Sequence, residues 1–320
     1  MKDWQPTASI ETLRRRAAAL AQVRAFFAQR GVMEVDTPVV VTAPVTDVHI
    51  HSAEVRFPNA GVPFFLHTSP EFAMKRLLAA GSGDIYEISH VVRGLERGRH
   101  HNAEFTLIEW YRHGFTLERL MDEVEALVRE VLGPVVDGFA SERLTYSGAF
   151  QKELGIDPLT CTREQFEAVA REMGLEPSAE TTRDDLLDFI MGARIGPRLG
   201  RKALTFIHRY PASQAVLARL DPTDPRVAMR FELYCEGVEL ANGFHELASA
   251  SEQRARFEED LAERRRRGLP AHWLDERLLS ALESGLPDCA GVALGFDRLL
   301  MLATGASRID EVLAFPTVRA

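Results

Sequence analysis

Apolar residues near the start of the chain recur at helical spacing. Ser9 before them and Gly31 after them are typical capping residues, so the pattern predicts a helix over residues 10–30. The apolar positions of this helix are Ile10, Leu13, Ala17, Leu20 and Phe27.

Short β-rich runs and longer amphipathic runs follow in the rest of the chain. The short runs predict strands at residues 32–41, 64–68, 85–92, 105–112, 204–209, 231–235, 238–241 and 291–294. The longer runs predict helices at residues 71–80, 117–132, 163–173, 183–191, 251–267 and 297–304. Ser69 is the expected cap of the second helix, with Pro70 at its first position. Residues 133–203 contain short helical pieces between Pro and Gly breaks, and we interpret them as a helical insertion.

Composition and charge narrow the class of protein. The chain has 320 residues, with 38 Lys or Arg and 47 Asp or Glu, so its formal net charge is −9. An acidic chain is poorly suited to coating a nucleic-acid backbone, and the run from Arg264 to Arg267 is better explained as cations at the C-terminus of a helix. Three widely spaced cysteines exclude a disulfide framework and a CxxC zinc site. Because no targeting segment and no apolar run of about 18 residues occurs, we expect a cytoplasmic protein that does not contact membranes.

Two stretches could bind a polyphosphate. Arg93 ends a predicted strand and precedes a loop rich in Gly, Arg and His, which could present several donors to an anion. A solvated basic loop explains the same residues equally well. The second stretch, from Gly291 to Arg298, feeds a strand directly into a helix, with Gly295 at the junction and Arg298 in the first turn. A packed strand–helix junction is the alternative interpretation.

Carboxylates form two further candidate groups. Glu239 and Glu246 are seven residues apart in a predicted strand plus turn, and their hard oxygen ligands suit Mg²⁺ or a substrate ammonium group. Glu109 and Tyr111 are two apart, so they point to one face of a strand, while Glu71 begins a helix. Two exposed acids at the end of a strand are the alternative for the first group, and an exposed sheet edge is the alternative for the second.

Taken together and in this order, the motifs resemble those of class II aminoacyl-tRNA synthetases of the lysyl type. The segment from Gly31 to Pro38 after a long helix resembles motif 1, the segment from Arg93 to Tyr111 motif 2, and the segment from Gly291 to Arg298 motif 3. The segment from Glu239 to Glu246 resembles the metal and substrate strand of those enzymes. The resemblance implies an α+β fold, an antiparallel sheet flanked by helices, and a homodimer that buries Val32 and Val35 at motif 1.

The chain is also similar to a stand-alone family, the elongation factor P–(R)-β-lysine ligases. Its opening, Trp4 to Ser9, the segment from Tyr210 to Ala215, and Ala293 in place of the usual Gly carry this likeness. The resemblance implies one catalytic domain over residues 1–320, with an insertion at about 133–203 and no anticodon-binding domain. It implies ATP-dependent activation of (R)-β-lysine or lysine as an adenylate, with Mg²⁺, and transfer to the ε-amine of a lysine on elongation factor P, without anticodon recognition.

The resemblance also implies roles for individual residues. Arg93 and Arg298 would hold phosphates as catalytic cations, and Glu239 and Glu246 would be catalytic and bind the metal. The ATP-binding residues would be Arg93, Gly94, Leu95, Glu96, His101, Asn102, Phe105, Glu239, Leu240, Gly295 and Arg298. The substrate-binding residues would be Ser69, Pro70, Glu71, Glu109, Tyr111, Asn242, Phe244, Glu246 and Ala293.

The motif 2 loop departs from the family pattern. Gly94-Leu95 stand where the family has Asn-Glu, whose Glu reads the adenine amino group; Leu95 cannot accept that hydrogen bond, and we expect Glu96 to replace it. Two alternative functions remain open at this point: a truncated lysyl-tRNA synthetase-like enzyme with another acceptor, and a catalytically weak, synthetase-like regulatory protein.

Overall fold

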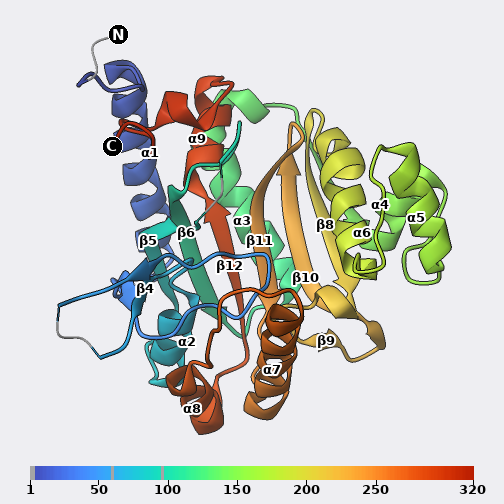
Figure 1. Cartoon of the computed structure of the whole chain (residues 1–320). Coiled ribbons are helices and arrows are strands. Elements are labelled where there is room, and N and C mark those ends of the chain that lie inside the picture. The colour runs from blue at the N-terminus through green and yellow to red at the C-terminus, as the bar shows by residue number, and fades with distance from the viewer. Residues whose placement is uncertain (1–3, 59–60, 95–96) are drawn as a thin grey trace. The chain divides into compact units, whose positions relative to one another are not determined.

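The structure is a computed structural model, and it describes residues 4–58, 61–94 and 97–320. The chain forms two compact units (Figure 1). The first contains Met1–Val135 and Leu247–Ala320, and the second contains Val136–Glu246. Among the residues that the structure describes, no helix is both long and apolar enough to cross a membrane.

The first unit contains two sheets. Its main sheet has the order β1-β5-β6-β12, where β1 (Met33–Glu34) is parallel to β5 (Ile85–Val92). Strands β6 (Glu104–His113) and β12 (Cys289–Gly295) continue it in antiparallel pairing. A small antiparallel sheet has β4 (Phe64–Leu66) between β2 (Val40–Val41) and β3 (Glu54–Val55).

Helices complete the first unit. They are α1 (Ile10–Gln29), α2 (Glu71–Ala79), α3 (Leu117–Leu132), α7 (Ala250–Arg266), α8 (Glu276–Gly285) and α9 (Phe296–Thr304), with short 3₁₀ turns at Gly133–Val136 and Ile309–Val312. The α1 helix is anchored by Phe27, whose ring stacks on Tyr86 of β5 at 4.3 Å and meets Trp110 of β6 edge-on at 5.3 Å. This aromatic contact fixes the helix that precedes motif 1 against the main sheet.

The second unit contains strands β7 to β11 and the helices between them. The sheet order is β7-β8-β10-β11, formed by β7 (Ala140–Thr145), β8 (Ala203–Pro211), β10 (Asp224–Cys235) and β11 (Val238–His245), while β9 (Leu220–Asp221) pairs with β10. The helices are α4 (Tyr146–Leu154), α5 (Arg163–Glu172) and α6 (Arg183–Ile190), followed by a π-helical turn at Met191–Ile195 and 3₁₀ turns at Gly196–Arg198 and Ala212–Gln214. Their apolar faces share a core around Phe150, Phe166 and Ile190 with residues of β8.

The predicted class, a mainly antiparallel sheet with flanking helices, is confirmed in both units. The helices expected at residues 10–30, 117–132 and 297–304 and the strand at 85–92 are present within one residue of the expected ends. Ser9 caps α1 by accepting a hydrogen bond from the backbone N–H of Thr12. The single-domain assignment with an insertion at 133–203 stays a prediction.

Four local expectations were wrong. The strand expected over residues 32–41, in which Pro38 indicated an edge or a break, is only two short pieces on either side of that proline, which cannot donate to a sheet ladder. No turn occurs at Asn242-Gly243, because both residues pair inside β11. Pro70, not Ser69, is the N-cap of α2, although the Ser69 hydroxyl accepts from the Glu71 N–H at 3.3 Å. Val32 is 5% exposed and lies in the core of its own chain, so it has little surface left for a dimer.

Candidate functional site

In the first unit, Arg93 follows directly after β5 and is held by backbone and ring contacts. Its Nε donates to the carbonyl oxygen of Thr68 at 3.2 Å, and its backbone N–H donates to the carbonyl oxygen of Ala103 at 2.8 Å. Its guanidinium lies 5.2 Å from the centre of the Phe105 ring. The structure therefore brings together two predicted ATP-binding residues, Arg93 and Phe105, in a cation–π arrangement.

The ring of His51 lies so close to residue 94 that only glycine fits there without displacing it. The Gly94 N–H donates to the carbonyl oxygen of His51 at 2.8 Å, and a Cβ at this position would lie 2.4 Å from Nδ1 of the same histidine. A side chain at position 94 would therefore displace the His51 ring. The next two predicted ATP-binding residues, Leu95 and Glu96, lie outside the described residues.

Arg298 in the first turn of α9 contacts the motif 2 loop. Its Nη2 donates to Nε2 of His101 at 2.7 Å, and its Nε donates to the carbonyl oxygen of His100 at 3.2 Å. Desolvation of the ring, followed by the positive charge of Arg298, lowers the pKa of His101 to about 4. His101 is therefore neutral at physiological pH and can accept the hydrogen bond.

Polar contacts hold the first turn of α9 against β6. Asp297 is buried, accepts a hydrogen bond from the backbone N–H of Thr106 at 2.7 Å and pairs with Arg16 of α1. Gly295 ends β12 opposite Leu107 of β6. These contacts fix the direction in which α9 leaves the sheet, and so the position of Arg298.

Asn102 has a structural role within its own loop. Its Nδ2 donates to the carbonyl oxygen of Glu104 at 2.6 Å, and its Oδ1 accepts from the backbone N–H of Thr317 at 3.1 Å. Both ends of the amide thus hold the motif 2 loop against the end of the chain. That Asn102 lines an ATP site stays a prediction.

The acidic face of β6 is confirmed as one group. The Tyr111 hydroxyl donates to Glu109 Oε1 at 2.7 Å, so the two side chains share a strand face. Glu109 pairs with Glu87 of β5 on one side and with Ala293 of β12 on the other. Burial raises the pKa of Glu87, a residue that sequence reasoning missed. Both carboxyl groups are buried, and such a pair suits a cationic group of a ligand.

The predicted substrate residue Glu71 has a lysine partner that sequence reasoning also missed. Lys75 Nζ lies 2.8 Å from Glu71 Oε1, one helical turn away, and only 1% of the lysine side chain is exposed. Glu71 remains accessible, with 14% of its side chain exposed. The spacing of four residues was the signal that could have identified this ion pair.

In the second unit, a β-bulge changes which side chains of β11 share a face. Leu233 pairs with Ala241, but the next residue of β10, Tyr234, pairs with Glu239, so Leu240 is the extra residue. In a regular strand, Glu239 and Asn242 would point to opposite faces because they are three residues apart. The bulge places Glu239 on the face that carries Asn242 and Phe244. Glu246 is buried one residue beyond the end of β11 and forms a β-bridge with Ala218.

The same face of β10 carries a carboxylate that sequence reasoning missed. Glu232 pairs directly with Asn242 in the sheet register. It accepts hydrogen bonds from Arg230 at 2.5 Å and from the Tyr234 hydroxyl at 2.7 Å. Alternation of polar and apolar residues over 230–234 was the signal that could have identified it, but the strand predicted at residues 231–235 began after Arg230.

Glu239 and Glu246 are the carboxylates expected to bind Mg²⁺. Within the described ranges, no cluster of three or more His, Cys, Asp or Glu side chains is arranged to enclose a metal ion. Mg²⁺ is commonly held by one or two carboxylates together with substrate phosphates, and the carboxylates of Glu239 and Glu246 fit that donor set. The residues therefore suit a metal that arrives with ATP.

Comparison with known proteins identifies the family. The model of class II tRNA synthetases (D, K and N) matches residues 3–319. A protein of Yersinia enterocolitica named elongation factor P–(R)-β-lysine ligase is 50% identical, with 99% of this chain and 98% of the relative aligned. The chain belongs to this ligase family. Proteins with the same name from Vibrio vulnificus, 50% identical with 98% of each chain covered, and from Proteus mirabilis, 51% identical with 99% of this chain and 98% of the relative covered, agree. Membership makes the chain a class II synthetase-like ligase.

Proposed function

We propose that this protein activates (R)-β-lysine, or lysine, with ATP and joins it to the ε-amine of a lysine side chain on elongation factor P in the cytoplasm. The observation that carries the proposal is identity of about one half, over nearly the whole chain, to relatives that bear this name. The arrangement of motif residues within each unit supports it.

The first step forms the acyl-adenylate. The carboxylate of the amino acid attacks the α-phosphorus of ATP, and pyrophosphate leaves. Arg93 and Arg298 are the proposed cations that offset the charge developing on the phosphates. Contacts with Thr68 and His101 hold these two guanidinium groups in place before ATP binds, which reduces the reorganisation needed during the reaction.

Further residues are proposed to bind ATP, the metal and the ammonium groups of the amino acid. Phe105, His101, Gly94, Leu240 and Gly295 are the proposed ATP contacts beside the arginines, with Asn102 as loop support. A bound Mg²⁺ would be held by Glu239 and Glu246 and would neutralise charge on the phosphates. The ammonium groups of the substrate are matched by the proposed carboxylates Glu71, Glu109 and Glu246, with Tyr111 as a neutral neighbour.

The second step transfers the acyl group. The neutral ε-amine of the acceptor lysine attacks the carbonyl carbon of the adenylate, AMP leaves with the electron pair of the broken C–O bond, and the nitrogen releases one proton to solvent as the amide forms. No side-chain nucleophile is required, because the adenylate is already an activated acyl group. The role of this chain in that step is to hold the adenylate and exclude water.

We also propose that the protein is a homodimer through motif 1. Met33 and Val39 are 49% and 40% exposed, although both are apolar and lie in or beside the short strands of this segment. Exposed apolar residues that cluster in one segment are typical of an isologous interface.

The proposal is tested with purified components. ATP–pyrophosphate exchange should depend on lysine or β-lysine, and incubation with ATP and elongation factor P should yield modified factor and AMP. Charging of tRNA in place of elongation factor P would favour the truncated-synthetase alternative. Absence of exchange with either amino acid would favour the regulatory alternative.

A further inference from the structure

A buried arginine in the second unit joins two strands and a loop. Arg230 of β10 donates from Nε to Asn242 Oδ1 at 3.2 Å, from Nη1 to the carbonyl oxygen of Gln214 at 2.8 Å and from Nη2 to Glu232 Oε1 at 2.5 Å. Only 12% of the Arg230 side chain and 10% of the Glu232 side chain are exposed. Each nitrogen of the guanidinium therefore has a different, fixed acceptor, which a planar fork of donors is suited to hold.

Gln214 belongs to the segment from Tyr210 to Ala215, called the loop below, which begins with the last two residues of β8 and carried part of the likeness to the ligase family. The Arg230 guanidinium lies over the Tyr210 ring, 4.2 Å from its centre. Gln214 in turn donates from Nε2 to Asp188 Oδ1 at 2.7 Å. The loop thus contacts Arg230 through an aromatic face and a backbone carbonyl, and α6 holds its far end.

The ends of this loop have unusual backbone conformations. Arg209 and Val216 have φ values of +60° and +52°, in the left-handed region that side-chain-bearing residues seldom adopt. Such conformations persist where surrounding contacts enforce them. The loop between β8 and β9 therefore has a defined backbone conformation that its contacts maintain.

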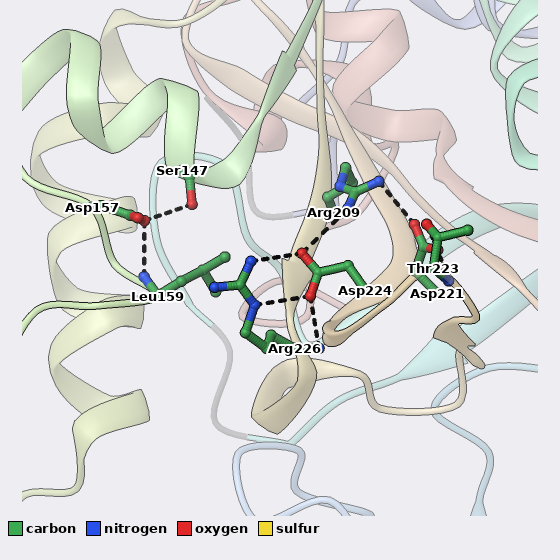
Figure 2. Close-up of polar contacts among 8 residues, drawn as sticks. All are labelled: Ser147, Asp157, Leu159, Arg209, Asp221, Thr223, Asp224 and Arg226. Carbon is green, nitrogen blue, oxygen red and sulfur yellow. Dashed lines mark hydrogen bonds and ion pairs between the residues drawn. The ribbon is translucent and has the colours of Figure 1, made fainter.

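Ion pairs near the protein surface hold Arg209 in its left-handed backbone conformation (Figure 2). Arg209 contacts Asp221 at 2.8 Å and Asp224 at 3.5 Å. Asp224 also accepts two hydrogen bonds of 2.9 Å from the guanidinium of Arg226. The two ion pairs of Arg209 tie the start of the loop to β9 and to the start of β10, the strand that bears Arg230.

The bond from Arg230 to Asn242 has a chemical consequence. The Nε–H group can only donate, so the amide oxygen of Asn242 must face Arg230, and the Nδ2 donors must face the other way. We propose that Arg230 is a positioning residue that fixes the Asn242 amide with its N–H donors directed at an oxygen of the bound amino acid, its carboxylate. This inference rests on the proposed function, which places Asn242 among the substrate-binding residues.

Arg230 should matter for the affinity for the amino acid and not for the affinity for ATP. An amide held with its donors outward recognises an acceptor on the amino acid and is irrelevant to the adenine and polyphosphate of ATP. Loss of Arg230 lets the amide rotate, because the two ends of an Asn side chain have almost the same shape. Amino-acid binding should then weaken while ATP binding is preserved.

The test uses three variants and a matched control. Arg230→Lys keeps a cation beside Glu232, which avoids leaving a buried carboxylate unpaired, but removes the Nε–H group. Asn242→Asp keeps an acceptor for Arg230 but removes the donors. Asn242→Ala provides the background for a double variant with Arg230→Lys. Arg226→Lys, an exposed arginine on the same strand, is the control.

Steady-state ATP–pyrophosphate exchange gives KM for each substrate, and the rise in melting temperature on adding β-lysine or lysine gives a second readout. We expect Arg230→Lys and Asn242→Asp to raise KM for the amino acid by about tenfold and to change KM for ATP by less than about twofold. In the Asn242→Ala background, Arg230→Lys should have almost no further effect on KM for the amino acid. Arg226→Lys should behave like the parent.

Three results would overturn the inference. They are an unchanged KM for the amino acid in Arg230→Lys, an equal rise in both KM values, and a full effect of Arg230→Lys in the Asn242→Ala background, which would show that Arg230 does not act through Asn242. A parent protein that supports no exchange with any lysine isomer would instead reject the proposed function and this inference with it. An active parent with a silent Arg230→Lys rejects the inference alone.

Discussion

Arg298 donates a hydrogen bond from Nη2 to Nε2 of His101 across 2.7 Å, and this contact joins motif 3 to the motif 2 loop. The ring can accept only while it is neutral, and its pKa of about 4 keeps it so. The partner therefore orients the guanidinium without neutralising its charge. An arginine held in this way stays fully available, as a cation, to a polyphosphate.

Removal of Arg298 should impair adenylate formation. In Arg298→Ala the positive charge proposed for the γ-phosphate is lost, and a charged hydrogen bond of about 1.5–3 kcal/mol corresponds to about one to two decades in kcat/KM for ATP. ATP–pyrophosphate exchange measures the loss, with the exposed Arg308→Ala as a control. Activity within about twofold of the parent would refute the motif 3 assignment.

His101 should make stability depend on pH. Its folded pKa of about 4 lies below the ordinary value of 6.5, so between these values the unfolded chain binds the proton more readily. Its contribution to stability is therefore complete above pH 6.5 and is lost as the pH falls toward 4. In His101→Gln the amide can accept from Arg298 without titrating, so the variant should lose less stability between pH 7 and pH 5.

Denaturant unfolding at the two pH values measures this difference. His49→Gln, at an exposed histidine in the same unit, is the control and should follow the parent. Identical losses in the parent and in His101→Gln would show that the Arg298–His101 contact does not depend on a neutral ring.

Restoring the family's usual residue at Gly94 should destabilise the protein. A Cβ there would lie 2.4 Å from Nδ1 of His51, so Gly94→Asn must displace that ring, at a cost of about 1–3 kcal/mol. The double variant Gly94→Asn/His51→Ala should recover much of the loss. Gly98→Ala is the control, since its added Cβ would lie 3.6 Å from His101 Nδ1. Thermal unfolding decides the matter, and a fully stable Gly94→Asn protein would contradict the explanation.

Ala293 should influence which lysine isomer is used. It pairs with Glu109 on the neighbouring strand, so its methyl group occupies space beside a proposed substrate carboxylate. Lysyl-type tRNA enzymes usually have Gly here, and Ala293→Gly should shift the ratio of kcat/KM values toward lysine and away from β-lysine. Exchange assays with both amino acids measure the ratio; an unchanged ratio would remove Ala293 from the proposed pocket.

A polar residue in motif 1 should disrupt the proposed dimer. We expect a sedimentation mass of about twice 35.8 kDa at micromolar concentration for the parent. Met33→Glu should shift the protein toward the monomer, because it places a charge in an apolar contact. Val32→Ala tests a different property: Val32 is buried in its own chain, so its loss should lower thermal stability first. A monomeric, active parent would contradict the dimer.

The sequence predicted the helices and strands whose bounds are determined by residues close to them in the chain. The α3 helix has its expected bounds because Thr116 caps it and its buried residues follow one helical face. Strand β5 has its expected bounds because a continuous β-rich run ends at Val92. The pairing of Glu109 with Tyr111 also followed from alternation alone.

Features that depend on pairing with a distant segment could not be predicted. The bulge at Leu240 depends on how β11 pairs with β10, and it decides that Glu239 shares a face with Asn242. The role of Arg230 required knowledge that a loop near Gln214 returns to it. The reason for Gly94 lies in His51, more than forty residues earlier in the chain.

Mass spectrometry of elongation factor P tests the central claim most directly. The factor is incubated with the protein, ATP, Mg²⁺ and either (R)-β-lysine or lysine, and then digested. The account predicts a mass increase of one lysyl group on a single lysine side chain, dependent on ATP and abolished in Arg298→Ala. An unmodified factor under conditions in which the protein exchanges pyrophosphate with ATP would contradict it and would direct the search to another acceptor.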